Sequence, residues 1–272
     1  MKEGLIILTI STESFGQGML LYTLTNKNGV TLKATDFGAR IVALDVPLTK
    51  NESRSLVLGF PSADEYLSKD LYFGATIGRT AGRIADGSFE LAGKKYQTMI
   101  NTPTQTTLHG GTPGFESKKW HSEIQEAQAN PSVKFWLESP AGENGFPGNL
   151  TVSVTYTLTE ENEWQIEYQA TTDEQTLFNP TNHDLINPNV ILKSPTKDIT
   201  LEMFTDQPSV VIFSANFADN GPDIQGQKLV NHGALTFETQ VCPGAERFPL
   251  FGSITLSPEQ EFHSTTRFKL IY

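Results

Sequence analysis

Two histidines have the side-chain chemistry and the surroundings that proton transfer to a ligand needs. His109 is followed by two glycines, in the sequence L-H-G-G at 108–111, and glycines leave room for a ligand beside the imidazole. His183 ends the polar sequence N-P-T-N-H at 179–183, directly after a predicted strand, where loops usually present catalytic groups. On spacing alone, hydrogen-bonded turns explain both segments roughly twice as well as a catalytic site does.

One glutamate and two arginines are the other candidates. Glu238 lies in an alternating apolar stretch at 235–240, so its carboxylate either faces solvent or points into a cleft. Arg79 and Arg83 stand four residues apart among glycines. Such an arginine fork can donate to sugar hydroxyls or hold a carboxylate, and a salt-bridged turn is the simpler alternative. A phosphate-binding loop is excluded because no helix-forming segment follows.

The elements that must position these groups are strands, because alternation with a period of two dominates the chain. The stretches 150–158 and 164–170 flank a polar turn and predict a β-hairpin. Glycine turns predict two more hairpins, within 20–34 and 88–97. Helical signal is confined to a turn or two at 62–67. Strands that recur about every ten residues without intervening helices predict an all-β fold, a large antiparallel β-sandwich.

Aromatic and apolar positions fit the same pattern. The three tryptophans, Trp120, Trp136 and Trp164, occupy strand positions, and we expect them in the core rather than on a stacking platform. The apolar run at 5–8 is short and has no small-residue cleavage site after it, so it predicts a strand rather than a signal peptide. No internal repeat or linker divides the chain, so we expect a single domain over 1–272.

Composition excludes several classes of protein. The 272 residues include 20 Lys and Arg against 31 Asp and Glu, which gives a net charge of −11. Nucleic-acid binding needs clustered basic residues, and here they are scattered, so a neutral small-molecule substrate fits better. Cys242 is the one cysteine, and no spacing of ligand residues suggests a metal site. No run reaches the ~18 apolar residues of a membrane span, so we expect a cytoplasmic protein.

Taken in order, these segments resemble the galactose mutarotase (aldose 1-epimerase) family. The matching segments are Y-T-L-T-N at 22–26, V-L-G-F at 57–60, F-G-A-T-I-G-R at 73–79, A-G-R-I at 81–84, L-H-G-G at 108–111, G-F-P-G-N-L at 145–150, N-P-T-N-H at 179–183 and F-E-T-Q at 237–240. Each segment is a weak signal alone, but the ordered set is specific and runs through most of the chain.

The resemblance implies a role for each matching residue. It implies that His183 is the general acid toward the ring oxygen of a sugar and that Glu238 is the general base. It also implies that His109 and Arg83 hold the sugar, that free hexoses such as galactose or glucose are the substrates, and that no cofactor or metal takes part. The implied fold is a large antiparallel β-sandwich, in agreement with the alternation, and we expect a monomer or homodimer.

The chain departs from the family pattern after N-P-T-N-H. Directly after Pro188 it continues into 190–201, a stretch that lies well downstream in the family, so a block of roughly 70 residues is missing near 187–190. In the family this block carries a further histidine and a substrate-binding aspartate. Either the printed sequence omits a segment of its parent protein, or the deletion is real and weakens the sugar site. The near-intact flanking motifs favour the first explanation.

Two other functions remain open. A non-catalytic carbohydrate-binding or sensor protein of the same fold could lack the aspartate. A related epimerase for phosphorylated sugars is disfavoured by the charge of −11 and by the absence of an arginine cluster in the sequence.

Overall fold

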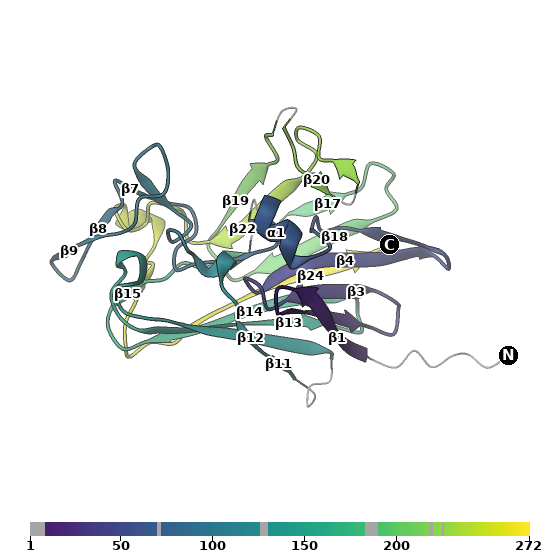
Figure 1. The fold of residues 1–272 in the computed structure, drawn as a ribbon, viewed down its shortest axis with the longest axis horizontal. Helices are drawn as coiled ribbons and strands as arrows, with labels where there is room; N and C mark the ends of the chain where they lie inside the picture. Colours follow the sequence, from purple (N-terminus) through teal and green to yellow (C-terminus); the bar gives the residue numbers. More distant parts are fainter. Residues whose placement is uncertain (1–8, 70–71, 126–129, 183–189, 218–219, 225) are drawn as a thin grey trace.

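Antiparallel strands make up most of the protein, and a single short α-helix accompanies them in the described part of the chain. The computed structural model describes residues 9–69, 72–125, 130–182, 190–217, 220–224 and 226–272 (Figure 1). No helix within these residues is long and apolar enough to cross a membrane. The strand that we expect at 5–8 lies outside the described residues.

A five-stranded meander forms the first sheet, in the order β1-β2-β3-β4-β5. Its strands are β1 (Thr9–Gly16), β2 (Met19–Thr25), β3 (Thr31–Thr35), β4 (Arg40–Thr49) and β5 (Glu52–Ser55). Helix α1 (Ala63–Lys69) follows it; the Ser62 hydroxyl accepts a hydrogen bond from the Glu65 N–H at 3.3 Å and so satisfies one free amide of the first turn.

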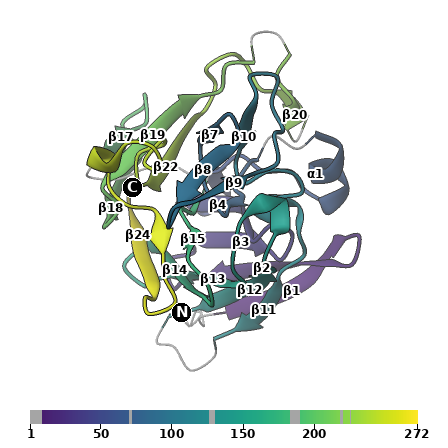
Figure 2. The same ribbon diagram turned by 90° about the vertical axis from the view of Figure 1, so that its left-hand side faces the viewer.

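A seven-stranded antiparallel sheet forms the second layer, in the order β11-β12-β13-β14-β24-β18-β17. Its strands are β11 (His121–Ile124), β12 (Ser132–Ser139), β13 (Leu150–Leu158), β14 (Glu163–Thr172), β24 (Phe262–Ile271), β18 (Thr200–Thr205) and β17 (Ile191–Lys193). Figure 2 shows β2 and β3 beside β12 and β13, and one core cluster joins side chains of both sheets. The predicted antiparallel β-sandwich is therefore confirmed.

Alternation along the long strands divides core from surface. In β13, Val152 and Val154 are fully buried, whereas Thr151 points to the outer face of the sheet and is exposed. The expected core position is confirmed for Trp120 and Trp164, each 1% exposed. It is wrong for Trp136, which is only half-buried because its β12 neighbours Phe135 and Leu137 take the inward positions.

Short strand pairs outside the two large sheets carry or adjoin the predicted site residues that the structure describes. They are β6 (Thr76–Ile77) with β16 (Thr181–Asn182), β7 (Arg83–Ala85) with β10 (Thr106–Leu108), β8 (Ser88–Leu91) with β9 (Lys94–Gln97), β15 (Thr176–Leu177) with β23 (Thr255–Leu256), β19 (Ser209–Ser214) with β22 (Leu235–Gln240), and β20 (Asp223–Ile224) with β21 (Gln227–Lys228). Three 3₁₀ turns complete the described elements, at Phe115–Ser117, Glu143–Gly145 and Pro249–Phe251.

Candidate active site

Glu238 is the one carboxylate among the predicted site residues, and the structure buries it. It lies in β22 and is 5% exposed, so its side chain does not face bulk solvent. Gln240 lies two residues further along the strand, on the same face, and is itself fully buried. The Gln240 Nε2 donates a hydrogen bond to the Glu238 Oε2 at 2.9 Å. An amide therefore fixes the orientation of the carboxylate.

Asn179, the first residue of the N-P-T-N-H motif, fastens that motif to the end of β22. Its Nδ2 donates to the Gln240 Oε1 at 3.4 Å and to the Val241 carbonyl at 2.9 Å. Its Oδ1 accepts a hydrogen bond from the Val241 N–H at 3.0 Å. Both the nitrogen and the oxygen of the Asn179 amide are therefore hydrogen-bonded. The N-P-T-N-H and E-T-Q motifs thus form one connected network that includes Glu238.

The backbone of the same motif joins the arginine turn. The Asn179 N–H donates to the Arg79 carbonyl at 2.9 Å, and the Ala81 N–H donates to the Asn179 carbonyl at 2.8 Å. Two residues later, β16 pairs with β6 and packs beside β22. His183 follows Asn182 directly in the sequence but lies outside the described residues.

His109 directly follows β10, and Arg83 begins its partner strand β7, so the two residues lie close together, as a sugar site built from both would need. Leu108 of β10 pairs with Arg83 of β7, and the His109 N–H donates to the Gly82 carbonyl at 2.9 Å. The imidazole is 7% exposed, and its Nδ1 accepts a hydrogen bond from the Gly82 N–H at 3.3 Å. Since a backbone N–H can only donate, Nδ1 carries no proton and Nε2 is the protonated nitrogen.

Tyr72 is a contact of this site that the sequence analysis missed. Its ring packs edge-on against the His109 imidazole, with 4.9 Å between the ring centroids. The residue is half-buried and precedes the F-G-A-T-I-G-R segment. No pattern in the sequence marks it, because it reaches His109 through a turn with a positive φ of 67° rather than through a strand register.

The two arginines do not form the fork that their spacing suggested. Arg79 is 2% exposed, and its guanidinium donates to the hydroxyls of Ser139 and Thr176 and to four carbonyls, at 2.7 to 3.1 Å. Burial lowers the pKa of Arg79 to about 10. Arg83 is exposed, and within the described residues its guanidinium makes no hydrogen bond or ion pair. Arg79 is therefore structural, and Arg83 is accessible to a ligand.

The glycines after His109 serve the backbone rather than a ligand, so the sequence interpretation was wrong on this point. A Cβ on Gly110 would collide with the Gly78 carbonyl oxygen, and one on Gly111 would lie 3.0 Å from the Asn144 side chain. Protein atoms already fill the space that the missing side chains leave. The two glycines let the L-H-G-G turn pack closely on the arginine turn, which sets the position of His109.

The predicted residues that the structure describes converge from three parts of the sequence. Arg83 and His109 are adjacent, and Glu238 is linked through Gln240 to the segment that borders the arginine turn. A Cβ on Gly82 would lie 3.0 Å from Pro243, so the turn before β7 also approaches the chain just after β22. Among the described residues, no group of three or more His, Cys, Asp or Glu side chains could hold a metal ion.

Comparison with known proteins identifies the family. A profile of the aldose 1-epimerase family matches residues 20–189 and 186–269, so the chain belongs to that family. Aldose 1-epimerase of Haemophilus influenzae is 29% identical over 84% of this chain and 88% of its own length. Human galactose mutarotase is 30% identical over 86% of this chain and 89% of its own.

Two solved structures share the fold. A GalM/aldose epimerase homologue from C. elegans superimposes with a TM-score of 0.81 at 22% identity, covering 97% of this chain and 99% of that one. The galactose 1-epimerase of Lactobacillus acidophilus gives a TM-score of 0.81 at 20% identity, with the same coverage of both chains.

The alignments also contain a long gap. The alignment to the Haemophilus protein runs over 307 positions, although 84% of 272 residues is about 228, so about 79 positions have no counterpart in this chain. The two pieces of the family match meet at 186–189.

Proposed function

We propose that the protein is an aldose 1-epimerase that interconverts the α and β anomers of free hexoses such as galactose or glucose. The observation that carries this proposal is the hydrogen-bonded chain from Glu238 through Gln240 to Asn179. A buried, oriented carboxylate is joined by this chain to the segment that leads into His183, which supplies the second proton-transfer group.

The proposed reaction needs two proton transfers. The Glu238 carboxylate removes the proton from the C1 hydroxyl while the His183 imidazolium gives a proton to the ring oxygen. The C1–O bond of the ring breaks as the C1 carbonyl forms, so the electron pair of that bond leaves on the ring oxygen. Rotation about C1–C2 presents the other face of the aldehyde. The reverse transfers close the ring and restore the protonation of both side chains.

Arg83 and His109 hold the sugar in this proposal. The Nε2–H of His109 is oriented as a donor because Nδ1 is an acceptor, and the exposed Arg83 guanidinium can donate to two hydroxyls at once. No step changes an oxidation state, and the two side chains supply both proton transfers, so the proposed reaction needs neither a cofactor nor a metal ion.

Polarimetry of freshly dissolved α-galactose tests the proposal. We expect the wild-type protein to speed mutarotation, and we expect Glu238→Gln and His183→Asn each to lower the rate by roughly 10²- to 10⁴-fold, the usual contribution of a general acid or base. Glu167→Gln and His263→Asn are matched controls, because that pair lies 3.1 Å apart on the exposed outer face of the sheet. Unchanged rates in both site variants would refute the assigned roles.

A second candidate function rests on the alignment gap. About 79 positions of the relatives have no counterpart in this chain, and by resemblance that block carries the substrate-binding aspartate. A carbohydrate-binding protein without activity would bind galactose in calorimetry and leave mutarotation at its spontaneous rate.

Faster turnover of hexose 6-phosphates than of free hexoses would instead favour a phosphosugar epimerase.

A further inference from the structure

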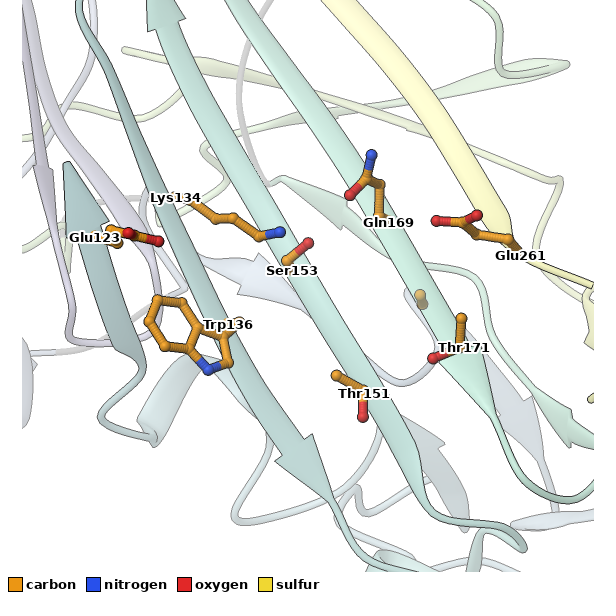
Figure 3. Close-up of a pocket in the computed structure, with 9 residues that line it drawn as sticks. Glu123, Lys134, Trp136, Thr151, Ser153, Gln169, Thr171 and Glu261 are labelled. Atoms are coloured by element: carbon orange, nitrogen blue, oxygen red, sulfur yellow. The ribbon is translucent and has the colours of Figure 1, made fainter. Parts of the chain in front are cut away.

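The outer face of the seven-stranded sheet contains a groove that the proposed reaction does not use. Figure 3 shows it crossing β11 to β14 and reaching the chain just before β24. Its volume is about 340 Å³, within the ~300 to 1,000 Å³ of small-molecule sites. Trp136 and Lys134 form one wall, and Gln169 and Glu261 form the other. The floor between these two walls is low because β13 carries small side chains there, such as that of Ser153.

Strand register aligns the groups of the groove in a row. Trp136 pairs with Ser153, and Ser153 pairs with Gln169. Neighbouring strands are ~4.8 Å apart, so this row spans about 10 Å across the sheet. A ligand that lies across the strands would therefore meet an indole, a hydroxyl and an amide in sequence.

Trp136 is held in place for this role. The His121 imidazole stacks on its indole with 5.3 Å between centroids and 22° between the ring planes. That contact covers one face of the indole and fixes its orientation, while the rest of the side chain lines the groove. The C–H face of a pyranose ring is apolar and its rim carries hydroxyls, so an indole beside hydroxyl and amide groups matches both surfaces.

Several polar groups of the groove are available to a ligand. The hydroxyls of Thr151, Ser153 and Thr171 and the ammonium of Lys134 have no hydrogen-bond partner within the described residues. Ser153 is only 7% exposed, so a ligand that bonds its hydroxyl also shields that bond from water. The charges in the groove are one positive and two negative, which disfavours an anionic ligand.

A second hollow extends the groove along the strands. It shares Thr151 and Thr171 with the first and continues to Asn149 and Asp173 at the ends of β13 and β14. The two hollows, of about 340 and 650 Å³, together offer more room than one sugar ring fills, so a chain of sugar residues suits them better.

We propose that this groove is a second saccharide site, which binds a neutral oligosaccharide and is separate from the site around Glu238. The two sites are on different parts of the fold. Glu238 belongs to the β19–β22 pair, whereas the groove lies on the solvent side of the seven-stranded sheet. The proposal does not depend on the mutarotase activity, because it requires only the outer-face residues.

Tryptophan fluorescence reports on the groove selectively. Trp120 and Trp164 are each 1% exposed, so acrylamide quenches mainly Trp136, the half-buried third tryptophan. We expect at least one of three neutral trisaccharides, maltotriose, cellotriose or β-1,4-galactotriose, to protect Trp136 from quenching. Gln169→Ala and Ser153→Leu, which fills the floor, should each raise the half-protecting concentration at least tenfold. Circular dichroism verifies that both variants fold.

Two control variants separate the groove from the rest of the protein. Gln165→Ala changes the same residue type on the same face of β14, outside the groove, and should leave protection unchanged. Glu238→Gln should also leave it unchanged while removing mutarotation, so failure of one site is distinguishable from failure of the other. The proposal is overturned if no trisaccharide protects Trp136, if Gln165→Ala abolishes protection as fully as Gln169→Ala does, or if trigalacturonate or oligolysine binds more tightly than every neutral trisaccharide.

Discussion

A strand glutamate is better suited to act as a base when its carboxylate is held away from water in one orientation. Glu238 meets both conditions, because it is 5% exposed and accepts a hydrogen bond from Gln240 at 2.9 Å. The amide of Gln240 is itself oriented by Asn179, which accepts and donates at the end of β22. The orientation of the proposed base therefore depends on two side-chain amides, those of Gln240 and Asn179.

Replacing Gln240 tests this positioning role. We expect Gln240→Met to lower kcat by about tenfold, since a hydrogen bond to a charged group contributes ~1.5 kcal/mol or more. The acidic limb of the pH–rate profile should move to higher pH, because the lost donor favoured the ionised carboxylate. Polarimetry between pH 4 and 8 measures both effects.

The profile separates positioning from simple loss of stability. A destabilised protein would lose rate equally at all pH values, whereas a lost hydrogen bond moves the limb. Gln165→Met, on the exposed face of β14, is the matched control and should leave the profile in place. An unmoved limb in Gln240→Met with full activity would show that Gln240 does not orient Glu238.

The sequence contained enough information to find Gln240 but not Tyr72. Residues two apart in a strand share a face, so the E-T-Q spacing alone places Gln240 beside Glu238. Tyr72 reaches His109 through a turn, and the path of a turn depends on tertiary packing that alternation does not encode. His183 was chosen from its motif, and its geometry stays a prediction because it lies outside the described residues.

At the scale of elements, the turn between β6 and β7 buries one of its two arginines and leaves the other exposed. Arg79 fastens this turn to the segments at 139–140 and 147–148 through its buried guanidinium. Arg83 begins the next strand, beside His109, and is exposed. The same residue type four positions apart thus takes opposite roles because one side chain points into the fold and the other out of it.

Parallel lysine substitutions should separate the two roles. Arg79→Lys loses most of six hydrogen bonds and leaves buried acceptors unpaired, so we expect a loss of about 3 kcal/mol of unfolding free energy and a Tm lower by roughly 6 to 12 °C. Arg83→Lys should leave Tm unchanged and raise KM for galactose about tenfold, since lysine cannot make a bidentate contact. Calorimetry and polarimetry measure the two effects, and an equal Tm loss in both variants would contradict the division.

The strands themselves were largely predictable from alternation. The hairpin expected at 150–158 and 164–170 is β13 and β14, and the helix expected at 62–67 is α1, Ala63–Lys69. The expected core position of Trp136 is wrong, although the residue does lie in a strand. Its neighbours Val133, Phe135 and Leu137 alternate inward, which already places Lys134 and Trp136 on the outer face. The sequence therefore predicts that these two side chains lie on the outer face, but it does not predict that the face is hollowed there.

At the scale of the whole molecule, the seven-stranded sheet ends in a short strand where the relatives have more chain. Within the described residues β17 is the last strand on that side, three residues long, and Ile191 is 52% exposed. In β19, which belongs to the separate β19–β22 pair, Ile212 is 58% exposed. The gap of about 79 aligned positions is compatible with strands that would cover this edge.

An exposed apolar edge has consequences that depend on the true length of the protein. If the chain is complete as printed, its intact mass is near 30.0 kDa and the edge is open. We then expect the protein to bind the dye ANS, because ANS covers exposed apolar surface. We also expect it to associate as its concentration rises, because an open edge strand pairs with the edge strand of another molecule. The double variant Ile191→Lys, Ile212→Lys should reduce both effects, with Thr255→Lys, at a half-buried position on a different strand pair, as control.

Intact-protein mass spectrometry decides between the two lengths before the dye experiment is interpreted. A segment of about 79 residues at the mean residue mass of this chain would add about 9 kDa. A protein of that larger mass should bind little ANS at this edge, because the additional strands would pair with β17 and cover Ile191. A protein near 30.0 kDa that neither binds ANS nor associates would contradict the open edge, since Ile191 and Ile212 would then have to be covered by chain that the printed sequence already contains.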